Sequence, residues 1–112
     1  MGRGVFAGRS YARGEVIEVC PVIPLTWAEA ADCADTILDD YFFAWGPRGK
    51  GYALVLGFGE LYNHSPDPNA RYTARTRALQ LVFRARRPIQ VGEQITIDYA
   101  WPKGKGMPES RI

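Results

Sequence analysis

Two short segments of this chain carry most of the residues that could do chemistry. The first, residues 61–69, reads LYNHSPDPN and holds the only histidine of the chain between an asparagine and a serine. Its prolines and turn-forming polar residues predict a loop rather than an ordinary strand or helix. The second, residues 93–99, reads EQITIDY, and its alternating apolar and polar residues predict a strand that ends on Tyr99.

The amide, the imidazole and the hydroxyl of the first segment allow two interpretations. A lone histidine is more often structural than catalytic, and Asn63 and Ser65 could simply close a turn. However, the apolar Leu61 and Tyr62 predict that part of the loop is buried, and buried amides and imidazoles need fixed partners. A ligand with amine, carboxylate and purine groups could supply them.

In order and spacing, the segments NHSPDPN and GEQITIDY resemble the two signature segments of the SET-domain protein-lysine methyltransferases. The resemblance implies that S-adenosylmethionine donates a methyl group to a protein lysine, and that Tyr99 is the catalytic residue. A tyrosine, with a pKa of about 10, is a poor general base at neutral pH. Its hydroxyl would therefore orient the lysine amine and contact the transferred methyl group through weak C–H···O bonds.

The same resemblance assigns the methyl-donor site. It would comprise Arg3 and Gly4 near the start of the chain, Asn63 and His64 in the loop, and Trp101 after the last strand. Glycine lets a backbone approach a ligand closely, although a Gly-x-Gly segment taken alone is most often a plain turn. For the tryptophan, a position in the core is as good an interpretation as stacking on the adenine of the donor.

The resemblance also implies a lysine channel, shaped by Tyr72, three residues after Asn69, and by Tyr41. A hydroxyl at Tyr72 would hold a water and favour monomethylation, but simple packing explains this residue equally well. Asn69 is expected to tie the loop beneath the C-terminal segment, which is a structural role. The chemistry needs no metal, and the resemblance assigns no metal ligand.

The 12 glycines and 8 prolines cut the chain into short pieces, which is typical of many short strands. Pro21 and Pro24 are expected to end the second strand. Residues 27–34 are the only expected helix, with Thr26 as N-cap and Glu29 as its capping-box partner. The predicted strands cover residues 4–7, 16–20, 41–45, 52–56, 70–74, 79–85 and 94–99.

Length and composition limit the class of protein. A chain of 112 residues with 46% hydrophobic content suits one folded domain. No apolar run approaches the roughly 20 residues that span a bilayer, and no signal-peptide pattern opens the chain. The expected location is therefore intracellular, in the cytoplasm or in a nucleus. Cys20 and Cys33 are too few for a disulfide framework or a four-thiolate zinc site.

The net charge is only +2, but the charges are unevenly placed. An uneven distribution of charge most often reflects a solvated surface, although it can also bind a charged polymer. A group of acidic residues could attract a basic peptide. The first half of the chain holds an acidic group, made of Glu29, Asp32, Asp35, Asp39 and Asp40. The second half is basic, with Arg71, Arg75, Arg77, Arg84, Arg86 and Arg87.

The short strands predict a mainly β chain, and the resemblance implies a β-clip-like SET-domain fold. It would have several short twisted sheets, a C-terminal loop threaded as a pseudoknot, and one short helix. Residues 1–112 would form a single SET domain whose tail, from about residue 100, closes the site. The predicted function is methylation of a lysine ε-amine in a basic, histone-like protein, with no requirement for nucleic acid and with a homodimer as one assembly.

Two other functions are compatible with the residues. The first is a non-catalytic SET-like module that binds a peptide or the cofactor, which donor binding without methyl incorporation would identify. The second is a small basic β-domain that binds nucleic acid through the arginines of the second half, which a salt-steep affinity for DNA would identify. The aromatic residues are not interleaved with those arginines, so the second is the less favoured.

Overall fold

The structure, a computed structural model, describes residues 4–46, 51–59 and 61–98 of the chain. These residues form mostly short strands, with one α-helix, α1 (Trp27–Asp32), and one 3-10 helix, η1 (Ile37–Tyr41). No helix in these ranges is long and apolar enough to cross a membrane. The strands are β1 (Val5–Phe6), β2 (Val16–Leu25), β3 (Phe42–Trp45), β4 (Gly51–Val55), β5 (Asn63–His64), β6 (Ala70–Arg75), β7 (Gln80–Ala85) and β8 (Gln94–Ile97).

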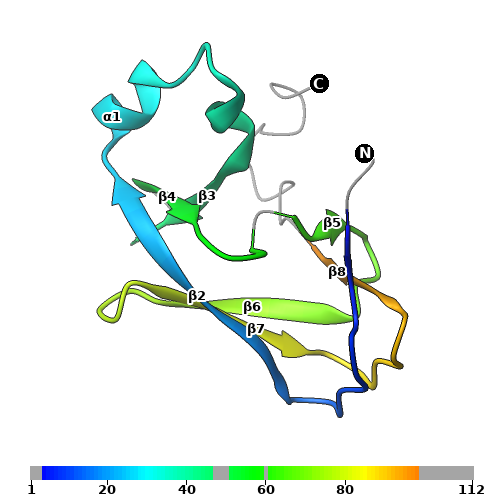
Figure 1. Cartoon of the computed structure of the whole chain (residues 1–112). Helices are drawn as coiled ribbons and strands as arrows, with labels where there is room; N and C mark the ends of the chain where they lie inside the picture. Colours follow the sequence, from blue (N-terminus) through cyan, green and yellow to red (C-terminus); the bar gives the residue numbers. More distant parts are fainter. Residues whose placement is uncertain (1–3, 47–50, 60, 99–112) are drawn as a thin grey trace.

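The strands form two sheets (Figure 1). The larger has the order β3-β4-β2-β7-β6, and all of its pairs are antiparallel. The smaller has the order β1-β8-β5, with β8 in the middle, antiparallel to β1 and parallel to β5. The start of the chain and the segment around residue 63 therefore lie on the two sides of the strand that precedes Tyr99.

Strand β2 is longer than predicted, because neither Pro21 nor Pro24 ends it. β2 pairs with β7 as far as Pro21 and with β4 from Val22 onward. The Pro21 carbonyl accepts a hydrogen bond from the Leu56 backbone on the β4 side, whereas the Val22 N–H donates to Leu79 on the β7 side. Backbone groups alternate between the two sides of a strand, so each proline nitrogen faces a position just past the end of a neighbouring strand, where no donor is needed.

The predicted helix is confirmed with its capping box. The Thr26 hydroxyl accepts from the Glu29 N–H at 3.1 Å, and the Glu29 carboxylate accepts from the Thr26 N–H at 2.9 Å. The helix ends at Asp32, two residues earlier than predicted. The 3-10 helix η1 is not among the predicted elements, and it takes Tyr41 out of the strand that was expected to begin there.

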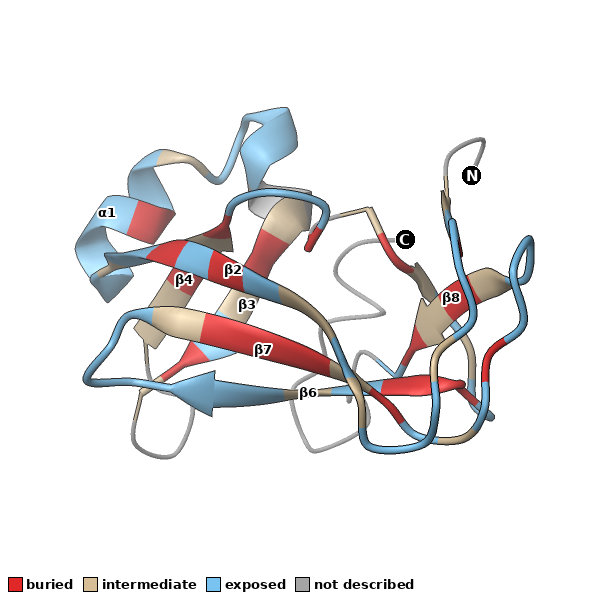
Figure 2. Cartoon of the chain, turned by 60° about the horizontal axis from the view of Figure 1, so that its bottom comes forward, coloured by how far each residue is buried: buried red, intermediate tan, exposed pale blue. Residues whose placement is uncertain are grey.

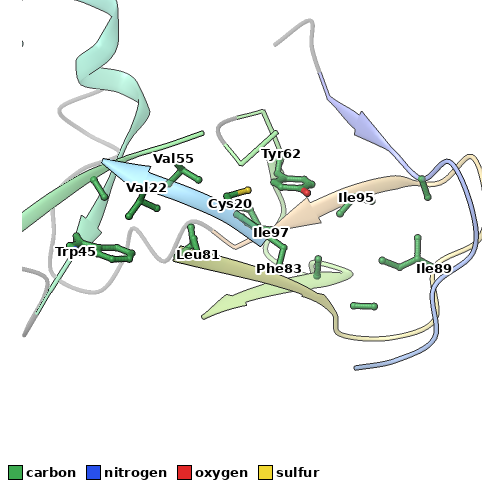
Figure 3. Close-up of a cluster of buried hydrophobic side chains, with 14 residues drawn as sticks. Cys20, Val22, Trp45, Val55, Tyr62, Leu81, Phe83, Ile89, Ile95 and Ile97 are labelled. Carbon is green, nitrogen blue, oxygen red and sulfur yellow. The ribbon is translucent and has the colours of Figure 1, made fainter. Parts of the chain in front are cut away.

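One cluster of buried side chains joins the two sheets. Phe83 of β7, Ile95 and Ile97 of β8, and Tyr62 before β5 all belong to it, and Figure 3 shows them turned toward one another. The red stretches of β7 and β8 in Figure 2 are the corresponding buried positions. Since burial of apolar surface is the main driving force of folding, this cluster fixes the larger sheet against the small sheet that carries the predicted site.

Asn69 is the one buried polar residue among those that the structure describes. Its Nδ2 donates to the Gln94 carbonyl at 2.8 Å, and its Oδ1 accepts from the Thr96 N–H at 2.9 Å. Its own N–H donates to the Thr96 hydroxyl at 3.3 Å. These bonds fasten the loop after β5 to the middle of β8, which confirms the structural role expected for Asn69.

Replacement of Asn69 by alanine should lower the free energy of unfolding by about 2–4 kcal/mol, because the Thr96 N–H and the Gln94 carbonyl would lose their partners in a buried place. Equilibrium unfolding in urea measures the change. Asp67→Ala in the same loop is the control, since the Asp67 side chain is 81% exposed and its surface ion pairs should contribute less than about 1 kcal/mol. Equal losses in the two variants would contradict this role.

Candidate functional site

Gly4 and Asn63, both predicted to hold the methyl donor, lie side by side although they are far apart in sequence. The Asn63 Nδ2 donates to the Gln94 Oε1 at 2.7 Å. A Cβ placed on Gly4 would lie 2.5 Å from that Gln94 oxygen and 3.0 Å from the Asn63 Nδ2. A side chain at position 4 would therefore push the two amides aside. The small sheet creates this neighbourhood, because β1 and β5 flank β8.

His64 lies next to the end of β8. Its Nδ1 is 3.8 Å from the Oδ1 of Asp98, the residue that directly precedes Tyr99, and both side chains are partly exposed. The segment predicted as a loop is thus in part a strand, since Asn63 and His64 pair in parallel with Thr96 and Ile97. The pairing sets the imidazole at the edge of the small sheet, where the predicted catalytic residue follows.

Tyr72 is half-buried and packs within a group of aromatic rings. Its ring lies 5.3 Å from that of Phe43, nearly perpendicular to it, and 5.8 Å from that of Phe83. Burial raises the pKa of the Tyr72 hydroxyl, and the negative charge of Asp98 raises it further. Tyr72 packs against the buried cluster that includes Ile95 and Ile97 of β8. Aromatic, partly desolvated surroundings of this kind disfavour an ammonium ion.

Tyr41 is half-buried at the end of η1, directly before β3. Within the described ranges, the ring contacts of Tyr72 are with Phe43 and Phe83 rather than with Tyr41. Tyr41 as a residue of the lysine channel therefore stays a prediction. Phe43, two residues later, contacts Tyr72 instead. The only sign of this in the sequence is its place in an aromatic segment.

Three predicted site residues lie outside the described residues: Arg3, Tyr99 and Trp101. The tail from about residue 100, which was expected to close the site, lies outside them as well. Their roles stay predictions. The structure does describe residues that neighbour two of them in the chain, because Gly4 follows Arg3 and Asp98 precedes Tyr99.

The carboxylate of Glu18 holds the segment before β5, although the sequence pattern did not predict a role for it. The Tyr62 hydroxyl donates to the Glu18 Oε1 at 2.6 Å, and the Phe58 N–H donates to the Glu18 Oε2 at 3.0 Å. The turn that contains Phe58 begins at Gly57, whose φ is +73° and whose Cβ would lie 2.7 Å from the Glu18 Oε2. An acidic residue within an otherwise apolar strand was the only signal in the sequence.

A bulge in β2 aims Glu18 at this segment. The register between β2 and β7 shifts between Val16 and Glu18, so that Glu18 faces the same side as Cys20 and lies opposite Phe83. Cys20 is fully buried and packs beside the same turn, as expected for an inert thiol. No group of three or more His, Cys, Asp and Glu residues that could hold a metal occurs in the described part of the chain.

Comparison with known proteins identifies the family. The SET domain model matches residues 2–100. This chain belongs to the SET domain family. A histone-lysine N-methyltransferase of Schizosaccharomyces pombe, specific for H3 lysine-37, is 30% identical over 115 residues, which cover 99% of this chain and 77% of that protein.

Solved structures share the fold. One from Plasmodium falciparum has a TM-score of 0.63 and 30% identity, covering 87% of this SET domain and 86% of that chain. The SET domain protein DIM-5 of Neurospora, a histone lysine methyltransferase, has a TM-score of 0.66 at 23% identity, over 87% of this chain and 47% of that one. The predicted family, the mainly β fold and the class of protein-lysine methyltransferase are confirmed.

The buried Tyr62 should make this SET domain sensitive to alkali. Burial and the hydrogen bond to Glu18 raise the pKa of Tyr62. The stabilisation that comes from the neutral phenol is therefore fully present below a pH of about 10 and is lost as the pH rises further. Tyr62→Phe should lower the free energy of unfolding by about 1–2 kcal/mol near neutral pH. The free energy of unfolding of this variant should then decrease less between neutral and alkaline pH than that of the unmodified protein. Urea unfolding across this pH range measures both effects, and an unchanged alkaline loss would contradict the assignment.

Proposed function

We propose that this SET domain transfers the methyl group of S-adenosylmethionine to the ε-amine of a lysine in a basic, histone-like protein. The observation that carries the proposal is that two different groups of side chains pack against β8. One is the close-packed polar group of Gly4, Asn63 and Gln94. The other is the aromatic group of Tyr72, Phe43 and Phe83. A strand that carries a polar group and an aromatic group suits a reaction between a polar cofactor and a lysine side chain.

The residues present fit the donor. S-adenosylmethionine, when bound, supplies a methyl group on a positively charged sulfur. The Gly4 backbone and the Asn63 amide would hold it, because the missing Cβ keeps the start of β1 close to the amide pair. His64 would contribute through its backbone. The family resemblance assigns Arg3 and Trp101 to the same donor site.

The aromatic group around Tyr72 would prepare the acceptor. Free lysine has a pKa of about 10.4, and apolar surroundings lower that pKa, so that more of the amine is neutral and nucleophilic. The ring faces can still accommodate a cationic methylated product through cation–π attraction. Tyr99 would orient the amine, and Tyr41 would extend the channel. A water on the Tyr72 hydroxyl would leave room for one methyl group, which favours monomethylation.

Surface charge suits a basic protein substrate. Glu29 and Asp32 on α1 and Asp35 after it are exposed, and such a group attracts cationic partners. The relative from Schizosaccharomyces pombe acts on a histone lysine, which supports a histone-like substrate and an intracellular location, nuclear in a eukaryote. A homodimer is a further expectation that sedimentation would measure.

The test is methyl incorporation from labelled S-adenosylmethionine into a panel of basic proteins, with Tyr99→Phe alongside. Label should appear on lysine and fall by about 100-fold or more in the variant, because misplacing a reacting group costs rate on that order. Mass spectrometry then counts the methyl groups. Donor binding without any incorporation would point instead to a non-catalytic binding module.

Gly4→Ala should weaken binding of S-adenosylmethionine about tenfold or more, equivalent to about 1.4 kcal/mol, because the new methyl group would displace the Asn63 and Gln94 amides. Gly8→Ala is the matched control, since a Cβ on Gly8 meets nothing within 4 Å. Calorimetric titration of both variants measures the affinity, after urea unfolding has shown that each is folded. Equal affinities in the two variants would argue against a donor site at Gly4.

A further inference from the structure

Four arginines of the β6–β7 hairpin take no part in the proposed reaction. Arg71 and Arg75 lie on the edge strand β6, Arg84 lies on β7, and Arg77 lies in the turn between them. The register pairs Arg71 with Arg84, and Arg75 follows Arg71 by four residues, so the three side chains leave the same face of the sheet. We call these four residues the arginine face.

The arginine face lies on the opposite side of the hairpin from the aromatic group. Tyr72 and Phe83 occupy the next pair of the same ladder, and their rings contact each other on the inner side. Figure 2 shows the end of β6 exposed while β7 is buried along much of its length. A ligand on the arginine face would therefore not compete with one near Tyr72.

The charge of this face is not neutralised within the described residues. Residues 70–92 contain six arginines and no aspartate or glutamate. Arg86 and Arg87 pair with Asp67, and Arg9 pairs with Glu15, but no described carboxylate forms an ion pair with the arginine face. Arg84 donates only a long hydrogen bond, 3.4 Å, to the Gly14 carbonyl.

Protection of a sheet edge does not explain this arrangement by itself. Charged residues on edge strands prevent sheets from pairing with each other, and Arg71 and Arg75 on β6 would suffice. Arg84, however, lies on the inner strand β7 and faces Arg71 directly. Like charges directly opposite each other destabilise a sheet, so the pair is unfavourable unless an anion bridges it.

We propose that the arginine face binds the phosphate backbone of a nucleic acid. Guanidinium groups match phosphate oxygens in bidentate geometry, and every basic residue between positions 70 and 92 is an arginine. The four-residue step from Arg71 to Arg75 spans about 13 Å along the strand. A row of that length suits a polymer with regularly spaced charges better than a single small anion.

The arginine face also bears on the substrate of the proposed function. This extension of the proposal rests on that function. The acidic residues of α1 lie near β4, toward one end of the larger sheet, whereas β6 is the edge at the other end (Figure 1). A basic protein bound to nucleic acid carries both charges that these two surfaces would attract. The substrate class inferred here is therefore a lysine-rich protein in complex with nucleic acid.

Fluorescence anisotropy of labelled duplex DNA and of labelled RNA, over a range of salt concentrations, tests the proposal. The logarithm of the binding constant should fall with the logarithm of the salt concentration with a slope of about −3 to −4, one contribution for each arginine. The triple variant Arg71→Gln, Arg75→Gln, Arg84→Gln should reduce this slope by about three and weaken binding at low salt by about tenfold or more. Comparison of the two probes identifies the preferred nucleic acid.

A pair of single variants controls for net charge and for folding. Arg75→Gln and Arg9→Gln each remove one positive charge, but the Arg9 guanidinium is paired with Glu15 at 2.9 Å. Only Arg75→Gln should reduce the slope, by about one. Equal effects of the two variants, no measurable binding of either probe, or tighter binding of polyglutamate than of nucleic acid would overturn the proposal.

The outcome can be separated from that of the methyltransferase assay. Binding of nucleic acid is measured without donor, and Tyr99→Phe should leave it unchanged. Arg75→Gln should leave methylation of a free basic peptide unchanged but reduce methylation of a basic protein presented on nucleic acid. Loss of the free-peptide reaction in Arg75→Gln would show that the arginine face is not a separate surface.

Discussion

The hydrogen bonds of the buried Asn69 amide fix where the loop after β5 meets β8, and the candidate site depends on that junction. Burying this amide without its partners would cost more free energy than the paired amide contributes to stability. The loop therefore has one favourable position on the strand. With the loop held there, Asn63 and His64 reach the edge of β8 in parallel register. The other edge receives the start of the chain, and Gly4 closes onto the Asn63 and Gln94 amides.

The larger sheet separates two kinds of surface. On its inner face, Glu18, Cys20 and Phe83 meet Tyr62 and the turn before β5, so that this face supports the candidate site. On its outer face, Arg71 and Arg84 stand opposite each other without a described carboxylate partner. Because side chains of a strand alternate between faces, one hairpin serves both surfaces.

Much of the local structure follows from neighbouring residues. The capping box of Thr26 and Glu29 was predictable because its partners are three residues apart. The hairpin β6–β7 was predictable because two alternating segments flank a short turn. The prolines of β2 were interpreted wrongly, since their effect depends on which neighbouring strand has ended beside them, and the sequence does not show that.

The family, the mainly β class and the residues expected at the donor and lysine sites depend on residue type and order, so they could be inferred from the amino-acid sequence. The strand at Asn63 and His64, the place of Gln94 in the polar group and the hydrogen bond between Glu18 and Tyr62 became visible only in the folded chain. The same holds for the common face of the hairpin arginines. Strand register, bulges and buried hydrogen bonds join residues distant in the chain, and their energies become defined only when the sheets pack.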